Sequence, residues 1–297
     1  MTIPAISAPR RARKHRAPQR PLTRQQFLRQ LVLIALAVVM FYPLAWMLGA
    51  SFRSDSAISD PGIWPGSQFT TSGYTEGWQG ISGVGFGRFI LNSFLVAALC
   101  VVANVVACAI TAYAFARIDF RLRRLWFALM LGTLMLPHHV ILIPQYLLFR
   151  HLGWINTYLP FVVPKLLATD AFFVFLLVQF FRAIPRELDE AARLDGCGHF
   201  GIFFRIILPL AKPALATAAI FTFIYSWNDF FTPLIYLNDP KLFTVPLALR
   251  SFIDTTSNSA FGALFAMSAL SLLPVLGVFI AFQRLLVDGI ATTGIRG

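Results

Sequence analysis

Long uninterrupted runs of apolar residues alternate along the chain with short polar segments. A helix needs about 20 apolar residues to cross a hydrocarbon core of roughly 30 Å. Six stretches of that order are found at residues 31–50, 91–116, 125–149, 161–181, 213–236 and 261–283. The pattern therefore predicts an all-α membrane protein with six transmembrane helices, of which the fourth carries Lys165 and Asp170 and the fifth carries Asp229.

Composition supports this prediction. Hydrophobic residues make up 57% of the 297 residues and charged residues only 13%, whereas a soluble domain has about 25% charged residues. The net charge of +12 does not indicate nucleic acid, because eight of the 25 Lys and Arg lie before Leu31 in a tail without Asp or Glu. A tail of this kind is typical of a cytoplasmic anchor that lies against anionic membrane lipid.

The positions of the positive charges also predict the orientation. With the N-terminus inside, nineteen of the 25 Lys and Arg fall in cytoplasmic segments, as the positive-inside rule requires. We therefore expect a basic cytoplasmic tail at residues 1–30, a transmembrane domain at 31–286 and a cytoplasmic C-terminal tail at 287–297. The apolar run from Leu31 is too long for a signal-peptide core, so it is interpreted as an uncleaved first span.

Two further features have simple interpretations. Cys100, Cys108 and Cys197 have no C-x-x-C spacing and no histidine at metal-ligand distance, so they are interpreted as packing residues. The segment 51–88, which this orientation places outside, is rich in Gly, Ser, Thr and Trp with little hydrophobic periodicity. It is expected to form an irregular lid or a surface for an external partner.

The cytoplasmic loop at 185–213 is charged and punctuated by glycine. Pro185 suits the first position of a helix and Gly196 suits a left-handed stop, which predicts a helix of about three turns. One face carries acidic and small groups, and Asp189 and Arg193 are spaced as an i,i+4 pair on another. The members of the first face are Glu187, Glu190, Ala191 and Leu194.

A second amphipathic helix is predicted after Gly196. Its apolar residues recur at spacings of three and four, namely Phe200, Phe203, Phe204 and Ile207. Pro209 and Pro213 then turn the chain into the fifth span. Taken residue by residue, the loop is better interpreted as a solvated connection between two spans.

The spacing within the loop decides between these interpretations. Glu190-Ala191-Ala192 is followed by Gly196 and then by Ile206, Leu208 and Pro209, and this arrangement resembles the EAA loop of binding-protein-dependent ABC importers. Asp195 also matches the family pattern, whereas Cys197-Gly198-His199 departs from it. The resemblance implies that the short helix is a coupling helix, with the residues just named and Glu187 seated in a cleft of a cytoplasmic ATPase.

The likeness extends from about Asn92 to the C-terminus, through segments such as "YAFARIDF" and "SWNDFFTPLIYLNDPKLFTVPLAL". These resemble the second permease subunit of maltose-type oligosaccharide importers. The resemblance implies a type I importer permease in a bacterial inner membrane, a second homologous permease, two ATP-binding subunits, an extracytoplasmic solute-binding protein and a sugar substrate. No cofactor is expected in this chain, since the partner ATPase would bind ATP and Mg.

Polar residues within the spans are candidates for a translocation path, because an ionisable group in a membrane is costly. Asp229 lies beside Asn228 and near Tyr225 and Trp227, which together offer the aromatic faces and hydrogen-bonding groups that a sugar needs. The alternative is that Asp229 only reaches interfacial water. For Asp170 and for His138-His139, structural pairing or contact with water is the preferred interpretation.

Other function classes fit less well. The chain has no G-x-x-x-x-G-K-[ST] phosphate loop, so we do not expect it to hydrolyse ATP. No Ser-His-Asp, paired-carboxylate or metal constellation stands out, which argues against a membrane enzyme. An ion-driven secondary transporter would show inverted repeats and a midplane ion site. An importer permease for another solute, such as a glycerophosphodiester or a polyol, remains the nearer alternative.

Overall fold

The computed structural model describes residues 24–58, 62–64, 66–253 and 260–291. Within these ranges the fold is helical, and β-type pairing is limited to two isolated bridges. The chain divides into two units, Met1–Ala45 and Trp46–Gly297. Most of the predicted basic tail lies outside the described residues.

Helix α1 covers Arg24–Ala50 and is apolar all round from Leu31 onward. Its residues up to Ala45 are exposed within their unit, which is typical of a helix that contacts lipid. In the second unit, the end of α1 is buried at Gly49. A Cβ there would lie 1.7 Å from the carbonyl oxygen of Ile63, so this close approach requires glycine.

The segment after α1 is more ordered than the irregular lid expected from the sequence. It contains η1 (Asp55–Ala57), η2 (Gly66–Gln68) and α2 (Ser72–Gln79). Helix α2 packs against the start of α14 (Phe261–Ala291), and the backbone N–H of Gly262 donates to the Asp55 carboxylate over 2.7 Å. The segment is therefore docked on α14.

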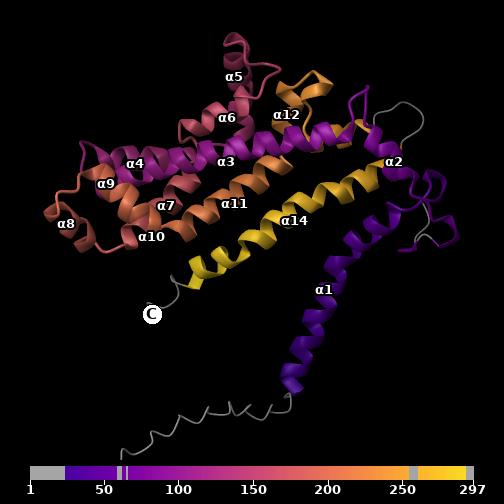
Figure 1. Ribbon diagram of the computed structural model, residues 1–297, viewed down its shortest axis with the longest axis horizontal. Helices are drawn as coiled ribbons and strands as arrows, with labels where there is room; N and C mark the ends of the chain where they lie inside the picture. Colours follow the sequence, from indigo (N-terminus) through magenta and orange to yellow (C-terminus); the bar gives the residue numbers. More distant parts are fainter. Residues whose placement is uncertain (1–23, 59–61, 65, 254–259, 292–297) are drawn as a thin grey trace, which may run out of the picture. The chain divides into compact units, whose positions relative to one another are not determined.

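The core of the second unit is formed by α3 (Phe86–Arg117), which packs along α7 (Ala171–Ala183) and α11 (Lys212–Asn228), while α11 also packs on α14 (Figure 1). Small residues allow this close packing. Those buried in α3 include Ala97, Cys100, Ala103, Asn104, Cys108 and Ala112. Asn104 donates from Nδ2 to the hydroxyl of Thr222 over 2.8 Å and links α3 to α11.

Three of the predicted spans are interrupted. The predicted helix at 125–149 is wrong as a single element: α4 (Arg123–Thr133) ends before Pro137 and α5 (His138–His151) starts after it, because proline disfavours helix at the residue before it. The predicted helix at 161–181 consists of α6 (Leu159–Leu166) and α7. The one at 213–236 consists of α11 and α12 (Phe231–Tyr236).

The remaining elements are short. They are α8 (Glu187–Leu194), α9 (His199–Ile202), the π-helical η3 (Phe203–Ile207), α10 (Leu208–Leu210), η4 (Pro240–Leu242) and α13 (Val245–Ser251). Helix α8 lies beyond the end of α3 in Figure 1. Helix α14 continues to Ala291, past the limit of 286 expected for the transmembrane domain.

Several helices are suited to a membrane. Within the described residues, four stretches have the necessary length and apolar character: Arg24–Ala50, Phe86–Arg117, Leu159–Ala183 and Phe261–Gln283. A fifth is obtained if His199–Leu210 and Lys212–Asn228, which meet at a bend of 76°, form one span. The chain is therefore a multi-pass membrane protein, and the count of six spans stays a prediction.

Candidate functional site

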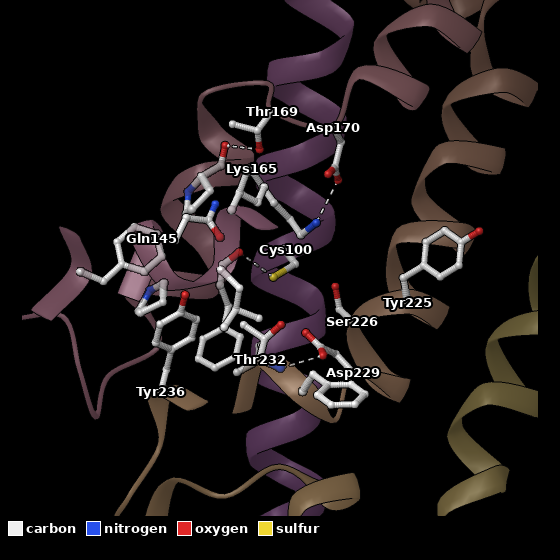
Figure 2. A pocket seen from close by; sticks show the side chains of 18 residues that line it. Cys100, Gln145, Lys165, Thr169, Asp170, Tyr225, Ser226, Asp229, Thr232 and Tyr236 are labelled. Carbon is white, nitrogen blue, oxygen red and sulfur yellow. Dashed lines mark hydrogen bonds and ion pairs between the residues drawn. The ribbon is translucent and has the colours of Figure 1, made fainter. Parts of the chain in front are cut away.

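A polar cavity of about 480 Å³ lies beside the middle of α3. Figure 2 shows that its walls come from α3, α5, α6, the α6–α7 break, α11 and α12. Apolar and aromatic side chains form much of the wall, and polar groups point into it, namely Gln145, Lys165, Thr169, Asp170, Ser226, Asp229 and Thr232. An apolar and aromatic wall into which several polar groups converge is the usual form of a small-molecule site.

The α6–α7 break brings two charged residues into this wall. The Lys165 ammonium lies 2.9 Å from Oδ2 of Asp170, with side chains 24% and 31% exposed. Ala168, between them, has a φ of +53°, and the Thr169 hydroxyl donates to the carbonyl of Pro164 over 2.9 Å. The prediction of structural pairing for Asp170 is confirmed. The side chains of His138 and His139 lie outside the described residues.

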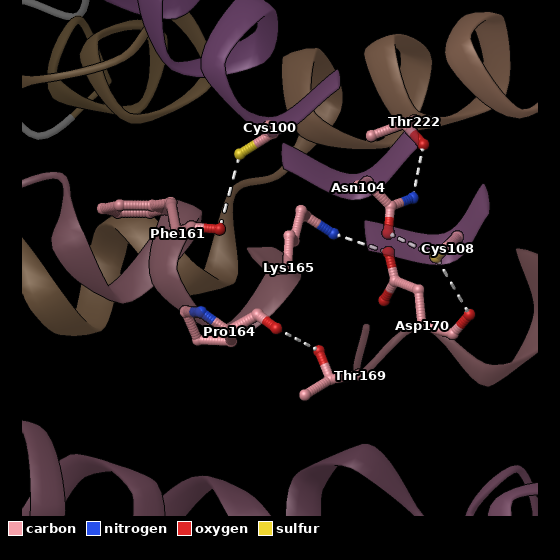
Figure 3. Close-up of polar contacts among 9 residues, drawn as sticks. All are labelled: Cys100, Asn104, Cys108, Phe161, Pro164, Lys165, Thr169, Asp170 and Thr222. Atoms are coloured by element: carbon pink, nitrogen blue, oxygen red, sulfur yellow. Dashed lines mark hydrogen bonds and ion pairs between the residues drawn. The ribbon is translucent and has the colours of Figure 1, made fainter. Parts of the chain in front are cut away.

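Buried hydrogen bonds support the break from behind (Figure 3). Cys108 donates from Sγ to Oδ1 of Asn104 over 3.2 Å, and Cys100 donates to the carbonyl of Phe161 over 3.4 Å. Among the described residues, no group of three or more His, Cys, Asp or Glu is arranged to hold a metal. Both thiols are buried in the helix packing, in agreement with the interpretation of Cys100 and Cys108 as packing residues.

The structure separates the four predicted path residues. Tyr225 is exposed and lines the cavity. Asp229 also lines the cavity, and its Oδ1 accepts a hydrogen bond from the backbone N–H of Thr232 over 3.1 Å. Asn228 is exposed outside the cavity lining and donates to the carbonyl of Ile224 over 2.8 Å. Trp227 also does not line the cavity. Of the four residues, only Tyr225 and Asp229 therefore line the cavity, and their place in a translocation path stays a prediction.

Trp227 belongs to the helix packing. Its ring is 2% exposed and stacks on Phe223 with a centroid distance of 5.7 Å. Its Nε1 donates to the carbonyl of Ser271 in α14 over 3.2 Å. The indole therefore joins α11 to α14, and the expectation that it offers an aromatic face to a solute is not supported by its position.

Aromatic faces at the cavity come from other elements, which sequence reasoning did not single out. The Tyr236 ring has its centroid 5.4 Å from that of Phe149 and 6.3 Å from that of Phe161, and all three residues line the cavity. Lys165 was recognised only as a charge within the fourth predicted span and not as a site residue, although a lysine five residues before an aspartate within an apolar span is a signal of pairing in the wall of a site.

The second feature is α8, which is shorter than predicted. Arg186 is its N-cap, so Pro185 precedes the helix and is not its first residue. The predicted stop is confirmed: Gly196 has a φ of +83°, and the N–H groups of Gly196 and Cys197 return to the carbonyls of Arg193 and Ala192 over 3.0 and 2.8 Å. This is a Schellman ending, in which a left-handed residue closes the helix.

The two sides of α8 differ. The residues of the predicted contact face are exposed, namely Glu187, Glu190, Ala191 and Leu194, and Leu194 is 90% exposed. Asp195 and Gly196 are exposed just after them, whereas Ala192 is buried. The acidic and apolar face of α8 is therefore exposed in this chain.

Asp189 anchors the other side of α8. The predicted pairing with Arg193 is wrong, because the Asp189 carboxylate points inward and lies 3.4 Å from Nη1 of Arg117. Nη2 of Arg117 donates to the carbonyls of Phe181 and Ile184 over 2.8 and 2.7 Å. One guanidinium thus joins the ends of α3 and α7 to α8.

The predicted second amphipathic helix has a different buried face. Phe203 and Ile207 are buried together with Ile202, but Phe200 and Phe204 are 82% and 58% exposed. The cause is the π-helical η3, which places more residues in a turn than the α-helical spacing assumes. Ile206 and Leu208 are partly buried against the core, and Pro209 is exposed.

Comparisons with known proteins agree with one another. The family model described as "Binding-protein-dependent transport system inner membrane component" matches residues 107–292. A probable ABC transporter permease, YurM of Bacillus subtilis, is 35% identical over 90% of this chain and 86% of its own length. The arabinooligosaccharides permease AraQ of Halalkalibacterium halodurans is 34% identical over 88% and 93%, and the sn-glycerol-3-phosphate permease UgpE of Rhizobium meliloti is 32% identical over 89% and 95%.

A solved structure has the same fold. It is a chain of a bacterial ABC transporter that imports the acidic polysaccharide alginate, with a TM-score of 0.77 at 23% identity. The match covers 88% of the present chain and 98% of that chain. The shared fold includes most of the residues described above.

Proposed function

Because the chain belongs to the family of inner membrane components of binding-protein-dependent transport systems, we propose that it forms part of the path by which an ATP-driven importer carries a sugar or oligosaccharide into the cell. The chain is a transport subunit and not an enzyme. The observation that carries the proposal is the combination, in one chain of this family, of a polar cavity against α11 and an exposed α8 at the end of the bundle.

The proposed assembly contains a second homologous permease, two ATP-binding subunits and an extracytoplasmic solute-binding protein. ATP and Mg are held by the ATP-binding subunits, because this chain has no phosphate loop. The exposed face of α8 enters a cleft of one ATPase, with Glu190 placed to pair with a basic residue there. Its small neighbour Ala191 permits close approach.

Transport is then coupled through the helices that meet α8. A displacement of α8 is passed through Asp189 and Arg117 to the ends of α3 and α7. Helix α11 follows the same loop and carries Tyr225, with Asp229 directly after its end. The cavity between α3 and α11 is thereby opened to one side of the membrane and then to the other.

The charges of the cavity support a neutral solute. Its lining residues of the Lys, Arg, Asp and Glu types are Lys165, Asp170 and Asp229, which give one net negative charge when all three are ionised. The ammonium is already paired with Asp170, and the carboxylate of Asp229 can accept hydrogen bonds from hydroxyl groups. A phosphate-bearing solute, which the name of the UgpE relative suggests as the alternative, would be repelled by this carboxylate.

We further propose a cytoplasmic N-terminus and six crossings of the membrane. The concentration of Lys and Arg in the tail and in the loops 117–124 and 182–212 supports this orientation. The half-buried Cys197 is first replaced by Ser, and single cysteines are then introduced at Ser72 and Arg186. An impermeant thiol reagent should label position 72 in intact cells, and labelling of position 186 would reverse the orientation.

The function is tested in proteoliposomes that contain the whole importer. Uptake of labelled arabino-oligosaccharides and of labelled sn-glycerol 3-phosphate is compared, each with the binding protein and with ATP inside. We expect sugar uptake that requires both ATP and the binding protein. Uptake that continues without ATP and stops when ion gradients are collapsed would instead assign the chain to secondary transport. Uptake of only the phosphate ester would keep the importer and change its solute.

A further inference from the structure

Three arginines surround a second hollow, of about 340 Å³, between the start of α4 and the end of α7. Its lining consists of Arg123, Arg124 and Arg182 with the ring of Phe127. It lies apart from the polar cavity and shares no lining residue with it. The solute path described above therefore does not account for it.

The arginines are held in different ways. Arg123 donates to the carbonyl of Ile118 over 3.1 Å and pairs with the exposed Asp119. The guanidinium carbon of Arg182 lies 5.2 Å from the centroid of the Phe127 ring, which is a cation–π contact. Arg124 is exposed, and the ion pairs found among the described residues involve neither Arg124 nor Arg182.

The local charge is therefore positive. Asp119 offsets one of the three guanidinium groups and leaves two of them. The start of α4 adds to this, because its N-cap, Leu122, offers no side-chain acceptor to the first N–H groups of the helix. Arginine presents its donors in a planar fork that suits the paired oxygens of a phosphate. The chemistry of the hollow is that of a phosphate site.

The remaining exposed surface of α4 is apolar. On the first two turns of α4, Leu125, Trp126 and Leu129 are 50%, 55% and 54% exposed. A tryptophan at this position is typical of the membrane–water interface, and exposed leucines of a membrane protein contact acyl chains. Basic pockets between transmembrane helices are suited to the head groups of anionic lipids.

We propose that Arg123, Arg124 and Arg182 bind the phosphate group of an anionic membrane lipid, with its acyl chains along the exposed side of α4. A soluble phosphate can contact the same guanidinium groups, but the hollow lies between two helices of a membrane protein, and the apolar exposed surface of α4 offers acyl chains a contact that a free anion does not use. The lipid thus joins the starting turn of α4 to the last turn of α7. This end of α7 is also where Arg117 contacts the carbonyls of Phe181 and Ile184.

The test uses the whole importer in a neutral detergent. Phosphatidylglycerol, phosphatidylcholine and inorganic phosphate are titrated separately, and bound lipid is counted by native mass spectrometry. The variant Arg124→Gln/Arg182→Gln removes the two arginines that have no acidic partner. The control, Arg121→Gln/Arg205→Gln, removes two exposed arginines outside the hollow and changes the net charge by the same amount.

We expect phosphatidylglycerol to bind in preference to phosphatidylcholine. Each arginine near the membrane surface contributes about 1 kcal/mol to the binding of an anionic lipid, which is about fivefold in affinity. The double variant should therefore weaken phosphatidylglycerol binding by about 30-fold, and the control should weaken it by much less. Should the double variant fail to assemble, Arg124→Gln alone should give about a fivefold loss. Equal binding of the two lipids, or equal losses in variant and control, would overturn the proposal. The proposal would also be overturned if inorganic phosphate displaced the lipid completely at a similar concentration, since the site would then bind soluble phosphate.

Discussion

The guanidinium of Arg117, at the end of α3, lies 3.4 Å from the carboxylate of Asp189 in α8, and the two side chains are only 2% and 9% exposed. Burial of this pair costs hydration, and among the described residues Nε of Arg117 and Oδ1 of Asp189 have no hydrogen-bond partner. A pair of this kind contributes little net stability compared with apolar residues of the same size. Its position between the bundle and the exposed α8 points instead to a role in holding α8 in place.

Variants that remove one or both residues of the Arg117–Asp189 pair should distinguish the effect of the pair on stability from its effect on transport. Asp189→Ala leaves the Arg117 charge buried and should lower the free energy of unfolding by about 3–5 kcal/mol. Arg117→Met/Asp189→Leu should restore most of that stability, because no charge is left unpaired, yet ATP hydrolysis should no longer drive uptake. Thermal unfolding is measured beside sugar uptake and ATPase activity. The control is Asp119→Ala, which removes the exposed carboxylate of the Asp119–Arg123 pair, a pair worth about 0–1 kcal/mol. Normal uptake by the Met/Leu variant would exclude a coupling role for the pair.

Glu190 tests the exposed face of α8. Since Glu190 is exposed in this chain, Glu190→Lys should leave the permease folded and inserted in the membrane. The free energy of binding to the ATPase should become less favourable by roughly 2–5 kcal/mol, because a cation then faces the basic residue expected in the partner. The measurement is the amount of ATPase that copurifies with the permease, and Arg193→Gln on the same helix is the control. Unchanged stoichiometry together with normal transport would refute docking through this face.

Glycine should be required at position 196 because of the backbone conformation there, and not because a side chain would lack space. A Cβ at Gly196 meets no atom within 4 Å, but its φ of +83° is strained for other residues. Gly196→Val should cost about 1–2 kcal/mol and displace the end of α8, which lowers uptake per ATP hydrolysed. Gly196→Asn should be milder, because asparagine tolerates this region. Gly198→Ala is the matched control, since Gly198 has a φ of −76° and open space around it. Equal losses at 196 and 198 would contradict the argument.

The elements that were predicted correctly from the sequence are those determined by residues close together in the chain. Helices α1, α3 and α14 follow from long apolar runs, and the stop at Gly196 follows from the freedom of glycine in the left-handed region. The break of the predicted third span at Pro137 could have been anticipated, because a proline after "LML" has the same local effect in a span as elsewhere.

Other features depend on residues far apart in the chain. The partner of Asp189 is Arg117, so an i,i+4 rule applied to α8 alone chose Arg193 instead. Periodicity could not foresee the π-helical turn at Phe203–Ile207, which left Phe204 exposed. The cavity likewise joins Lys165 of α6 to Asp229 after α11. Their proximity is a consequence of how α6 and α11 pack against α3.

Asp229 and its neighbours provide the test of the cavity. Asp229→Ala removes a carboxylate from the cavity wall and also the acceptor for the N–H of Thr232 at the start of α12. Asp229→Asn keeps an oxygen for that N–H and removes the charge. If the charge excludes anionic solutes, Asp229→Asn should raise the uptake of sn-glycerol 3-phosphate relative to sugar, whereas Asp229→Ala should lower sugar uptake.

The adjacent residues separate this effect from simple damage to the fold. Asn228→Ala changes an exposed side chain outside the cavity lining and should leave solute preference unchanged. Trp227→Ala removes a buried ring and should cost about 3–5 kcal/mol of stability, so less complex should be recovered, with the preference of the remainder intact. Uptake is therefore measured per assembled complex for both solutes. If Asn228→Ala shifted the preference as much as Asp229→Asn, the cavity would not be the site of selection, since only Asp229 of the two lines it.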